Sequence, residues 1–318
     1  MATDHPGGLT REHVVWAYRL LLDRDPESED VIGPKLAGSR DTRELRHHLM
    51  TSAEFRDKNR DYAHTNDRTL VIKELDGSEP VRLFVDLSDH VIGLNIVRGR
   101  YEADEVAFVR SLVQRGDTVV DVGAHIGFFT MQLAALVGPQ GRVYAFEPLG
   151  ANADLVERSI HENAFGGRVV FARAAVGAAS GVARLTYPRE TLNSGGAYLL
   201  RDDDAPLPGN LAADTPVVAL DDAGIDRRVR FIKMDVEGAE PQVLRGAARL
   251  LARDRPIIMS ELHPTQLERA SGTTPQAFLD QIRALGYRAH RLEQGAPGAV
   301  LEQAPADALV SILLLPFG

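Results

Sequence analysis

The sequence contains 318 residues, of which 44% are hydrophobic and 25% are charged, the usual balance for a globular protein with a large core. Its formal net charge is −9 and no run of Lys and Arg stands out, which argues against duplex nucleic acid as a partner. The absence of cysteine excludes disulfides, thiolate metal sites and covalent catalysis through a cysteine adduct.

The N-terminal residues, MATDHPGGLTREH, lack the basic stretch and apolar core of a secretory signal. No window approaches 18 consecutive apolar residues, so we expect a cytoplasmic protein without a membrane span. The length exceeds that of one typical domain, which favours a large α/β unit with a smaller appendage.

The first 66 residues have the pattern of a small helical domain. Thr10 can cap a helix with apolar residues at helical spacing, and further helices are expected after Ser28 and Asp41. The segments AYRLLLDRDPES and LRHHLMTSAEFR resemble a short helical domain found beside bacterial sugar- and surface-modifying enzymes. His47 and His48 suggest a metal site, but neighbouring helical positions point apart, which favours an exposed, solvated face. The sequence therefore predicts a helical domain over residues 1–66 and a second domain over 67–318.

The second domain begins with short alternating runs at 82–85 and 91–94, which predict strands or a hairpin. A helix is expected over 105–114 because its apolar residues recur on one face. The segment Gly99–Glu102 precedes this helix, and the sequence leaves open whether it folds over a ligand or forms a plain turn.

The stretch 116–148 reads GDTVVDVGAHIGFFTMQLAALVGPQGRVYAFEP, which predicts a strand, a glycine turn, a helix and a second strand ending in Glu147. This order is typical of a nucleotide-binding βαβ unit. Its glycines let the backbone approach a ligand closely, and the helix start offers unpaired N–H groups. Glu147 follows Gly123 by 24 positions, a spacing that suits hydrogen bonds from the two hydroxyls of a ribose.

The glycine turn indicates which ligand this unit binds. A dinucleotide site requires G-x-G-x-x-G, whereas this turn has only Gly123 and Gly127, with Ala124 and His125 between them. Such a turn, preceded by Asp121, looks like the first motif of S-adenosylmethionine-dependent methyltransferases. That cofactor has no pyrophosphate, and an acid at Asp121 suits its cationic methionine head. An NAD-binding oxidoreductase is therefore disfavoured.

The region 191–214 is rich in glycine and polar residues, and its length predicts a functional lid or a partly disordered segment. Its acidic triplet at 202–204 suggests a cation site, but solvated charge is the favoured interpretation. A helix over 152–163 and a strand at 169–171 are expected before it.

The later strands are expected to end in polar residues. The run 229–234 ends in Asp235, and the run 256–260 is followed by Glu261 and His263. Because ligands bind beyond the carboxyl ends of strands in open α/β sheets, we expect these residues to face one crevice with Asp121 and Glu147. Helices over 241–251 and after Thr274, and an antiparallel pair at 287–292 and 309–315, complete the chain.

Methyl transfer to an alcohol requires removal of the hydroxyl proton. His263 is the first candidate for the base, with Asp235 or Glu261 orienting it. The rival prediction is that Asp235 and Glu261 bind a divalent cation such as magnesium, which would bind the substrate oxygens. The alternative for His263 is a helix or loop cap without chemistry.

The segments DTVVDVGAHIGFFT, VYAFEP, FIKMDVEGAEPQVLRGA and IIMSELHP together resemble the FkbM family of methyltransferases over about Tyr101 to Gly286. The resemblance implies a seven-stranded Rossmann-like sheet, mostly parallel with an antiparallel last strand, and S-adenosylmethionine as cofactor. It also implies O-methylation of a hydroxyl on a sugar, glycoside or secondary metabolite. His125 departs from the family, which usually has asparagine at that position.

Two other functions remain open. A nucleic-acid N-methyltransferase would show an Asn/Asp-Pro-Pro-aromatic signature where this chain has Asp235-Val236-Glu237-Gly238. A cofactor-binding scaffold without catalysis is disfavoured because Asp235, Glu261 and His263 are all present. The acceptor, which we expect to be a small molecule or glycan, and a possible homo-oligomeric state are not determined by the sequence.

Overall fold

The computed structural model describes residues 9–50, 52–58, 69–77, 79–89, 91–188, 194–201, 204–305 and 308–317. The chain divides into two compact units, Met1–Arg68 and Thr69–Gly318. The interpretation of these units as separate domains stays a prediction. Within the described residues no helix is long and apolar enough to cross a bilayer.

The described part of the first unit includes the helices α1 (Arg11–Leu22), α2 (Glu29–Ala37), α3 (Thr42–Met50) and α4 (Ala53–Lys58). As predicted, Thr10 caps α1, because its side chain accepts a hydrogen bond from the backbone N–H of His13. The helices pack around a small core formed by Val14, Tyr18, Leu22, Ile32, Leu45 and Leu49. The His48 ring lies 3.0 Å from the hydroxyl of Ser39, while the side chain of His47 is outside the described residues.

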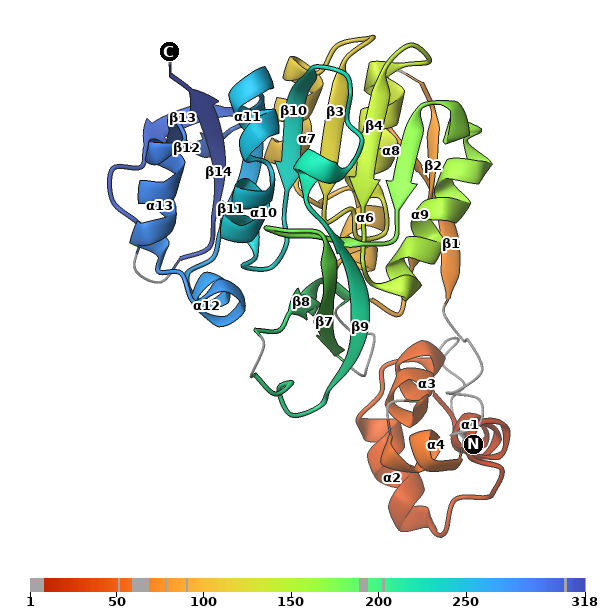
Figure 1. Ribbon diagram of the computed structural model, residues 1–318. Coiled ribbons are helices and arrows are strands. Elements are labelled where there is room, and N and C mark those ends of the chain that lie inside the picture. Colours follow the sequence, from red (N-terminus) through yellow and green to blue (C-terminus); the bar gives the residue numbers. More distant parts are fainter. Residues whose placement is uncertain are drawn as a thin grey trace. The chain divides into compact units, whose positions relative to one another are not determined.

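The second unit is built on an eight-stranded sheet with helices on both faces (Figure 1). Its strands are β3 (Thr118–Val122), β4 (Arg142–Phe146), β5 (Val169–Ala172), β10 (Val229–Met234), β11 (Ile257–Leu262), β12 (Tyr287–Glu293), β13 (Ala296–Val300) and β14 (Val310–Pro316). They are ordered β13-β12-β14-β11-β10-β3-β4-β5. The five strands from β11 to β5 are mutually parallel, and β14 pairs antiparallel with both β11 and β12.

This sheet confirms the predicted α/β fold. The strands β5-β4-β3-β10-β11-β14-β12 form the expected seven-stranded, mostly parallel sheet with an antiparallel strand near its end. The sequence analysis missed β13, which pairs antiparallel with β12 as an eighth strand at the edge. The strand order reverses direction between β3 and β10. After β3 the chain adds β4 and β5 on one side, and after β10 it adds β11 on the other side. Ligands bind at such switch points in open α/β sheets.

Alternating side chains of the central strands enter two separate cores. Val119 of β3 and Phe231 of β10 pack on one face, against α7 (Ala103–Leu112), α8 (Phe128–Val137) and α9 (Gly150–Glu162). Val120 and Ile232 pack on the other face, against α10 (Glu240–Gly246), α11 (Ala248–Asp254) and α13 (Pro275–Ala284). Burial on both faces explains why these strands are almost continuously apolar.

Two elements differ from the sequence prediction, and a third was not predicted. The run 91–94, predicted as a strand, instead leads into the short helix α6 (Gly93–Val97), beside the hairpin of β1 (Leu70–Leu75) and β2 (Val81–Asp86). The expected single helix over 241–251 is divided into α10 and α11 at Ala247. A π-helical turn, Leu267–Ser271, follows the short helix α12 (Pro264–Gln266).

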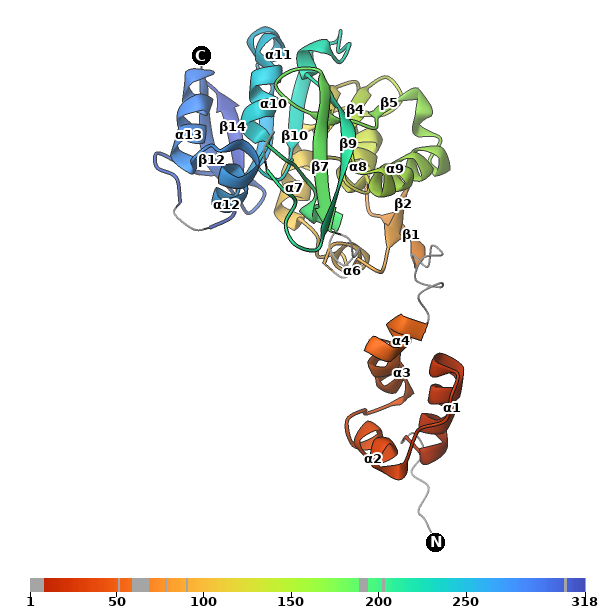
Figure 2. The ribbon, with the colours of Figure 1, turned by 60° about the horizontal axis from the view of Figure 1, so that its bottom comes forward.

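The region 191–214, predicted as a functional lid or a partly disordered segment, contributes β8 and the start of β9 to a second sheet. Strands β6 (Ala175–Val176), β7 (Gly181–Pro188), β8 (Tyr198–Leu199) and β9 (Asn210–Val218) form this sheet in the order β6-β9-β7-β8. Residues 189–193 and 202–203, which include part of the acidic triplet, lie outside the described residues. In Figure 2, turned so that the bottom of Figure 1 comes forward, β7 and β9 lie in front of the main sheet.

The predicted cap of α13 provides a test of local stability. The Thr274 hydroxyl accepts a hydrogen bond of 3.2 Å from the N–H of Ala277. We expect Thr274→Ala to lower the free energy of unfolding by about 1 kcal/mol and the melting temperature by about 2–4 °C, measured by thermal denaturation. Thr273→Ala is the matched control, and an equal loss in both variants would contradict the role of the cap.

Candidate active site

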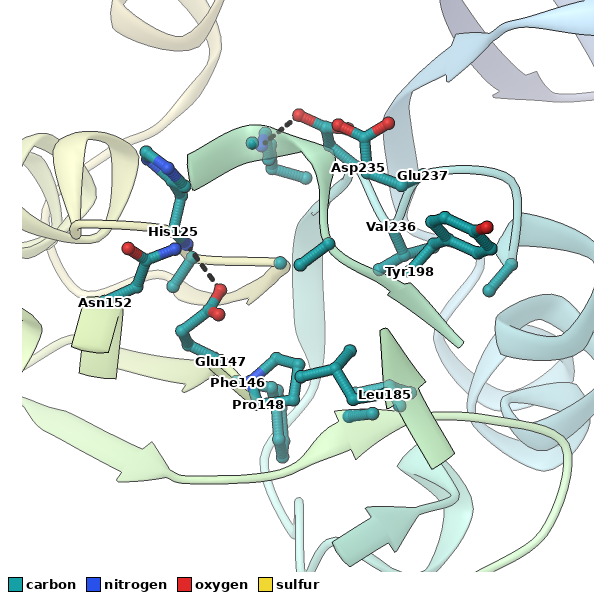
Figure 3. Close-up of a pocket in the computed structure, with 18 of the residues that line it drawn as sticks. His125, Phe146, Glu147, Pro148, Asn152, Leu185, Tyr198, Asp235, Val236 and Glu237 are labelled. Carbon is teal, nitrogen blue, oxygen red and sulfur yellow. Dashed lines mark hydrogen bonds and ion pairs between the residues drawn. The ribbon is translucent and has the colours of Figure 1, made fainter. Parts of the chain in front are cut away.

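A pocket lies at the carboxyl ends of β3, β4 and β10, where the sheet order reverses. Its floor includes Gly123, Ala124 and the strand end Phe146–Pro148, and its opposite wall includes Leu185 and Tyr198 from the second sheet. Figure 3 shows Glu147 and Asn152 on one side of this pocket and Asp235 and Glu237 on the other. The pocket therefore lies between the strand ends of the main sheet and residues of the second sheet.

The glycine turn after β3 is shaped by a close approach to β10. Gly123 has φ +81°, and a Cβ at this position would overlap the carbonyl oxygen of Asp235. The N–H groups of Gly123 and Ala124 both donate to the carbonyl of Phe146, at 3.1 and 2.9 Å. Gly127, also at positive φ, is the N-cap of α8. Only glycine permits this geometry at Gly123, so the turn brings the ends of β3, β4 and β10 together.

Glu147 is 5% exposed and borders the pocket. Its Oε2 accepts a hydrogen bond of 2.8 Å from the N–H of His125, and its Oε1 accepts one of the same length from the N–H of Leu149. Burial raises the pKa of Glu147 to about 7, although these two hydrogen bonds oppose the shift. The backbone thus holds both carboxylate oxygens in a fixed orientation at the pocket, as recognition of a diol requires.

His125 lies in the left-handed region at φ +53° and lines the pocket beside Glu147. Burial lowers the pKa of the His125 imidazole to about 4, so the ring is neutral at pH 7. The structure therefore places a neutral, half-buried ring where the FkbM family usually has asparagine.

Asp121 does not line the pocket. It is fully buried on β3, where the Thr130 hydroxyl of α8 donates a 2.6 Å hydrogen bond to its Oδ2. Its Oδ1 is buried with no hydrogen-bond partner among the described residues, and burial raises its pKa. Its direct contact with a cationic methionine head, expected from the sequence, stays a prediction.

The far side of the pocket carries a buried ion pair. Lys233 of β10 is 7% exposed, and its Nζ lies 3.1 Å from Oδ2 of Asp235. Burial alone would lower the pKa of Lys233, but the surrounding carboxylates outweigh it and raise the pKa. The ammonium group also lies 5.3 Å from the ring centre of Phe129. Lys233 is therefore charged and holds Asp235 at the edge of the pocket.

Glu237 follows in an unusual backbone conformation, with φ +55°. The Glu240 carboxylate accepts hydrogen bonds from the N–H groups of Val236 (3.2 Å) and Gly238 (3.3 Å), which stabilises the turn. Burial, together with Asp235, raises the pKa of the Glu237 carboxyl, and Gln266 donates a hydrogen bond to it. Strained backbone of this kind concentrates at functional sites, and here the Glu237 side chain lies beside Asp235 at the edge of the pocket (Figure 3).

A second, smaller cavity lies next to this ion pair. It is lined by Glu102 and Glu261 together with Lys233 and Asp235. Burial raises the pKa of Glu102 to about 7 and also raises that of Glu261. Tyr101 hydrogen-bonds to Glu102 and lines the main pocket. The segment that the sequence left open as a ligand cover or a plain turn thus contributes to both cavities.

The predicted catalytic residues are only partly brought together. Asp235 lines both cavities, Glu261 lines the smaller one, and His263 lines neither. His263 is the N-cap residue of α12, and its Nδ1 is buried without a partner among the described residues. In the part of the chain that the structure describes, no group of three His, Asp or Glu side chains is arranged to hold a metal. The base role of His263 and the magnesium site stay predictions.

Sequence reasoning missed Lys233, Tyr198 and Leu185 as pocket residues. A signal for Lys233 was present, because a lysine inside the apolar run FIKMD must be buried and therefore needs carboxylate partners. No comparable signal marked Leu185 and Tyr198, since their place in the pocket depends on the second sheet.

A family model described as the Methyltransferase FkbM domain matches residues 121–289, more than half of the chain. The chain belongs to the FkbM methyltransferase family. This confirms the resemblance drawn from the motifs and establishes the chain as an S-adenosylmethionine-dependent methyltransferase. The match begins at Asp121 and includes every predicted site residue.

Solved structures with a similar fold include a methyltransferase FkbM from Methylobacillus flagellatus KT, with 16% identity and a TM-score of 0.42, which covers 94% of this chain. The FkbM chain described here spans 58% of that protein. A putative rRNA-methylase from Clostridium thermocellum matches with 16% identity and a TM-score of 0.40, covering 67% of this chain and 94% of that one. A SAM-dependent O-methyltransferase from Thermotoga maritima shares 14% identity, with a TM-score of 0.38 and 78% of each chain covered. A search of curated proteins gave no significant match.

The pocket residues fit S-adenosylmethionine. Its sulfonium and amino groups are positively charged, and Asp235, paired with Lys233, lies at the pocket edge. Both oxygens of Glu147 are oriented at the pocket, which also has apolar surface from Phe146, Pro148 and Val176. The contact of Glu147 with the ribose hydroxyls stays a prediction.

The close approach at Gly123 predicts a large effect of a single methyl group. We expect Gly123→Ala to cost at least about 2 kcal/mol of stability, from the left-handed backbone and the overlap with Asp235, and to weaken S-adenosylmethionine binding. Thermal denaturation and calorimetric titration measure the two effects. Gly166→Ala, at a position with nothing within 4 Å of a new Cβ, is the control; wild-type stability of Gly123→Ala would refute the constraint.

The raised pKa of Glu147 predicts pH-dependent cofactor binding. The protonated carboxyl cannot accept hydrogen bonds with both oxygens, so affinity should fall as pH decreases through about 7, by about tenfold per unit well below it. Calorimetric titration of S-adenosylmethionine at pH 6, 7 and 8 measures this. Glu147→Gln should bind weakly at every pH, and an identical pH profile in that variant would assign the effect to another group.

Proposed function

We propose that this FkbM methyltransferase is an O-methyltransferase that methylates a hydroxyl of a sugar, glycoside or secondary metabolite. The observation that carries the proposal is the position of Asp235 and Glu237, whose carboxylates line the same pocket as the ribose-binding candidate Glu147. A proton acceptor is thereby available where the methyl donor is expected. An alcohol has a high pKa and needs such an acceptor.

Bound S-adenosylmethionine would supply an activated methyl group for in-line displacement. The chain's own contribution is to align the hydroxyl and remove its proton. The ammonium group of Lys233 forms an ion pair with Asp235, with Nζ 3.1 Å from Oδ2. A positive charge bound beside these groups would lower the pKa of Glu237, which leaves Glu237 ionised and able to accept the proton of the hydroxyl.

The wall from the second sheet supports a small acceptor of mixed polarity. It presents Leu185, Leu199 and the Tyr198 ring, and the guanidinium carbon of Arg269 lies 5.7 Å from the centre of that ring. Such a surface, largely apolar with few polar groups, is typical of small-molecule sites. It suits an organic alcohol better than a strongly anionic substrate.

Transfer of a labelled methyl group from S-adenosylmethionine tests the proposal. The purified enzyme is incubated with panels of glycosides and secondary-metabolite alcohols and with their amino analogues. Products are separated, and the site of methylation is assigned by NMR. Labelled ethers from the alcohols are the expected result; label only in the amino analogues would establish N-methylation instead. If S-adenosylmethionine binds but no compound of the panels is methylated, the result would favour a non-catalytic scaffold.

The proposal predicts which side chain takes the proton. With an acceptor found in that screen, Glu237→Gln should lower kcat about 100-fold or more while S-adenosylmethionine affinity is retained. The kcat of the wild type should rise with pH to a plateau, and this rise should be absent in the variant.

His263→Ala is the matched comparison, because this residue lines neither cavity. It should keep most of the wild-type kcat. The reverse pattern, a slow His263→Ala and an active Glu237→Gln, would return the base role to His263. Loss of turnover with a chelator, restored by magnesium, would support the predicted metal at Asp235 and Glu261.

A further inference from the structure

A third cavity lies at the opposite end of the central strands from the methyl-transfer pocket. It has a volume of about 740 Å³ and is bordered by Thr118 and Val229, the first residues of β3 and β10. This volume lies within the range of small-molecule sites. The lining includes four arginines, Arg227, Arg228, Arg230 and Arg255, and two acids, Asp117 and Asp254.

The two acids of this cavity are already engaged elsewhere. Both oxygens of Asp254 are bound by the guanidinium of Arg253 at 2.7 Å, and Oδ2 also accepts from the N–H of Val229 at 2.8 Å. Asp117 Oδ2 accepts a hydrogen bond from the N–H of Gln114. These carboxylates therefore do not neutralise the arginines through direct hydrogen bonds.

The arginines differ in whether their side chains form hydrogen bonds to the backbone. Arg255 donates to the carbonyls of Gly286 and Phe317, and Arg227 donates to the carbonyl of Gln140. Arg228 and Arg230 are exposed, and among the described residues neither makes a hydrogen bond or an ion pair. Arg228 influences Asp254 only through its charge. Two guanidinium groups with all their donors available thus border one cavity.

Arg230 is positioned by an irregularity of the sheet. Between Val229 and Phe231 the register of β10 against β3 shifts, because Val229 pairs with Thr118 and Phe231 pairs with Val119. Arg230 is therefore the extra residue of a β-bulge. Bulges are unusual in parallel pairs, and they redirect a side chain next to functional sites. Here the bulge places Arg230 in the lining of the arginine-rich cavity.

We propose that this cavity is a binding site for a small molecule that carries a phosphate or diphosphate group. The planar guanidinium groups of Arg228 and Arg230 match the geometry of phosphate oxygens, which they bind through paired, charge-assisted hydrogen bonds. The site is independent of the methyl-donor pocket, since the two lie at opposite ends of β3 and β10. A concentration of unpaired cations in a chain of net charge −9 directs an anion to this cavity.

Calorimetric titration of the full chain with inorganic pyrophosphate tests the site, with sodium chloride holding the ionic strength constant. Saturable binding with one site per chain is expected. In Arg228→Gln/Arg230→Gln, the Kd should rise at least about tenfold, because two charge-assisted hydrogen-bonding groups are lost. S-adenosylmethionine binding by the same variant should be unchanged, which shows that it is folded.

Arg173→Gln/Arg249→Gln is the matched control. It removes the same charge from two exposed residues outside the cavity and should keep the wild-type Kd for pyrophosphate. Three results would each overturn the proposal: no saturable binding, equal Kd values in the two double variants, or citrate binding as tightly as pyrophosphate. The last would identify a site for multivalent anions without preference for phosphate.

Discussion

The contact between Gly123 and the carbonyl oxygen of Asp235 is the constraint on which the site depends. No side chain fits between them, so the turn after β3 and the end of β10 lie against each other. Glu147, oriented by the N–H of His125 in that turn, then borders the same pocket as Asp235 and Glu237. The ends of β3, β4 and β10 therefore meet beside one glycine and border one pocket, at the point where the sheet order reverses.

Charge is the second organising feature. One buried lysine, Lys233, serves a group of carboxylates that includes Asp235, Glu102 and Asp121. Burial raises the pKa of Glu102 and of Asp121, because the low-dielectric interior disfavours their negative charge. In the proposed mechanism, a bound cationic cofactor would favour the ionised form of these acids. Cofactor binding would then also ionise the proposed proton acceptor, Glu237.

Much of the fold was predictable because local patterns reflect local structure. The βαβ unit at 116–148 and the antiparallel pair β12 and β14 follow from apolar runs, turn residues and capping residues that act over a few positions. The second sheet was not predictable in this way. Its strand β9 begins inside a region rich in glycine and polar residues, and pairing with β7 stabilises it. The wall of the pocket that contains Tyr198 and Leu185 depends on this pairing, so it was missed with it.

The sequence by itself determined that the chain carries the glycine turn, the terminal acids and the motifs of the FkbM family, because these depend on residue type and spacing. Only the tertiary structure decided which of these residues line a cavity. Asp121 is buried against α8, where it accepts a hydrogen bond from Thr130, and His263 lines neither the pocket nor the smaller cavity. Lys233 and Glu237, by contrast, line the pocket. The physical reason is that spacing along a strand selects the face of a residue. What covers that face is decided by helices and strands that are distant in the chain.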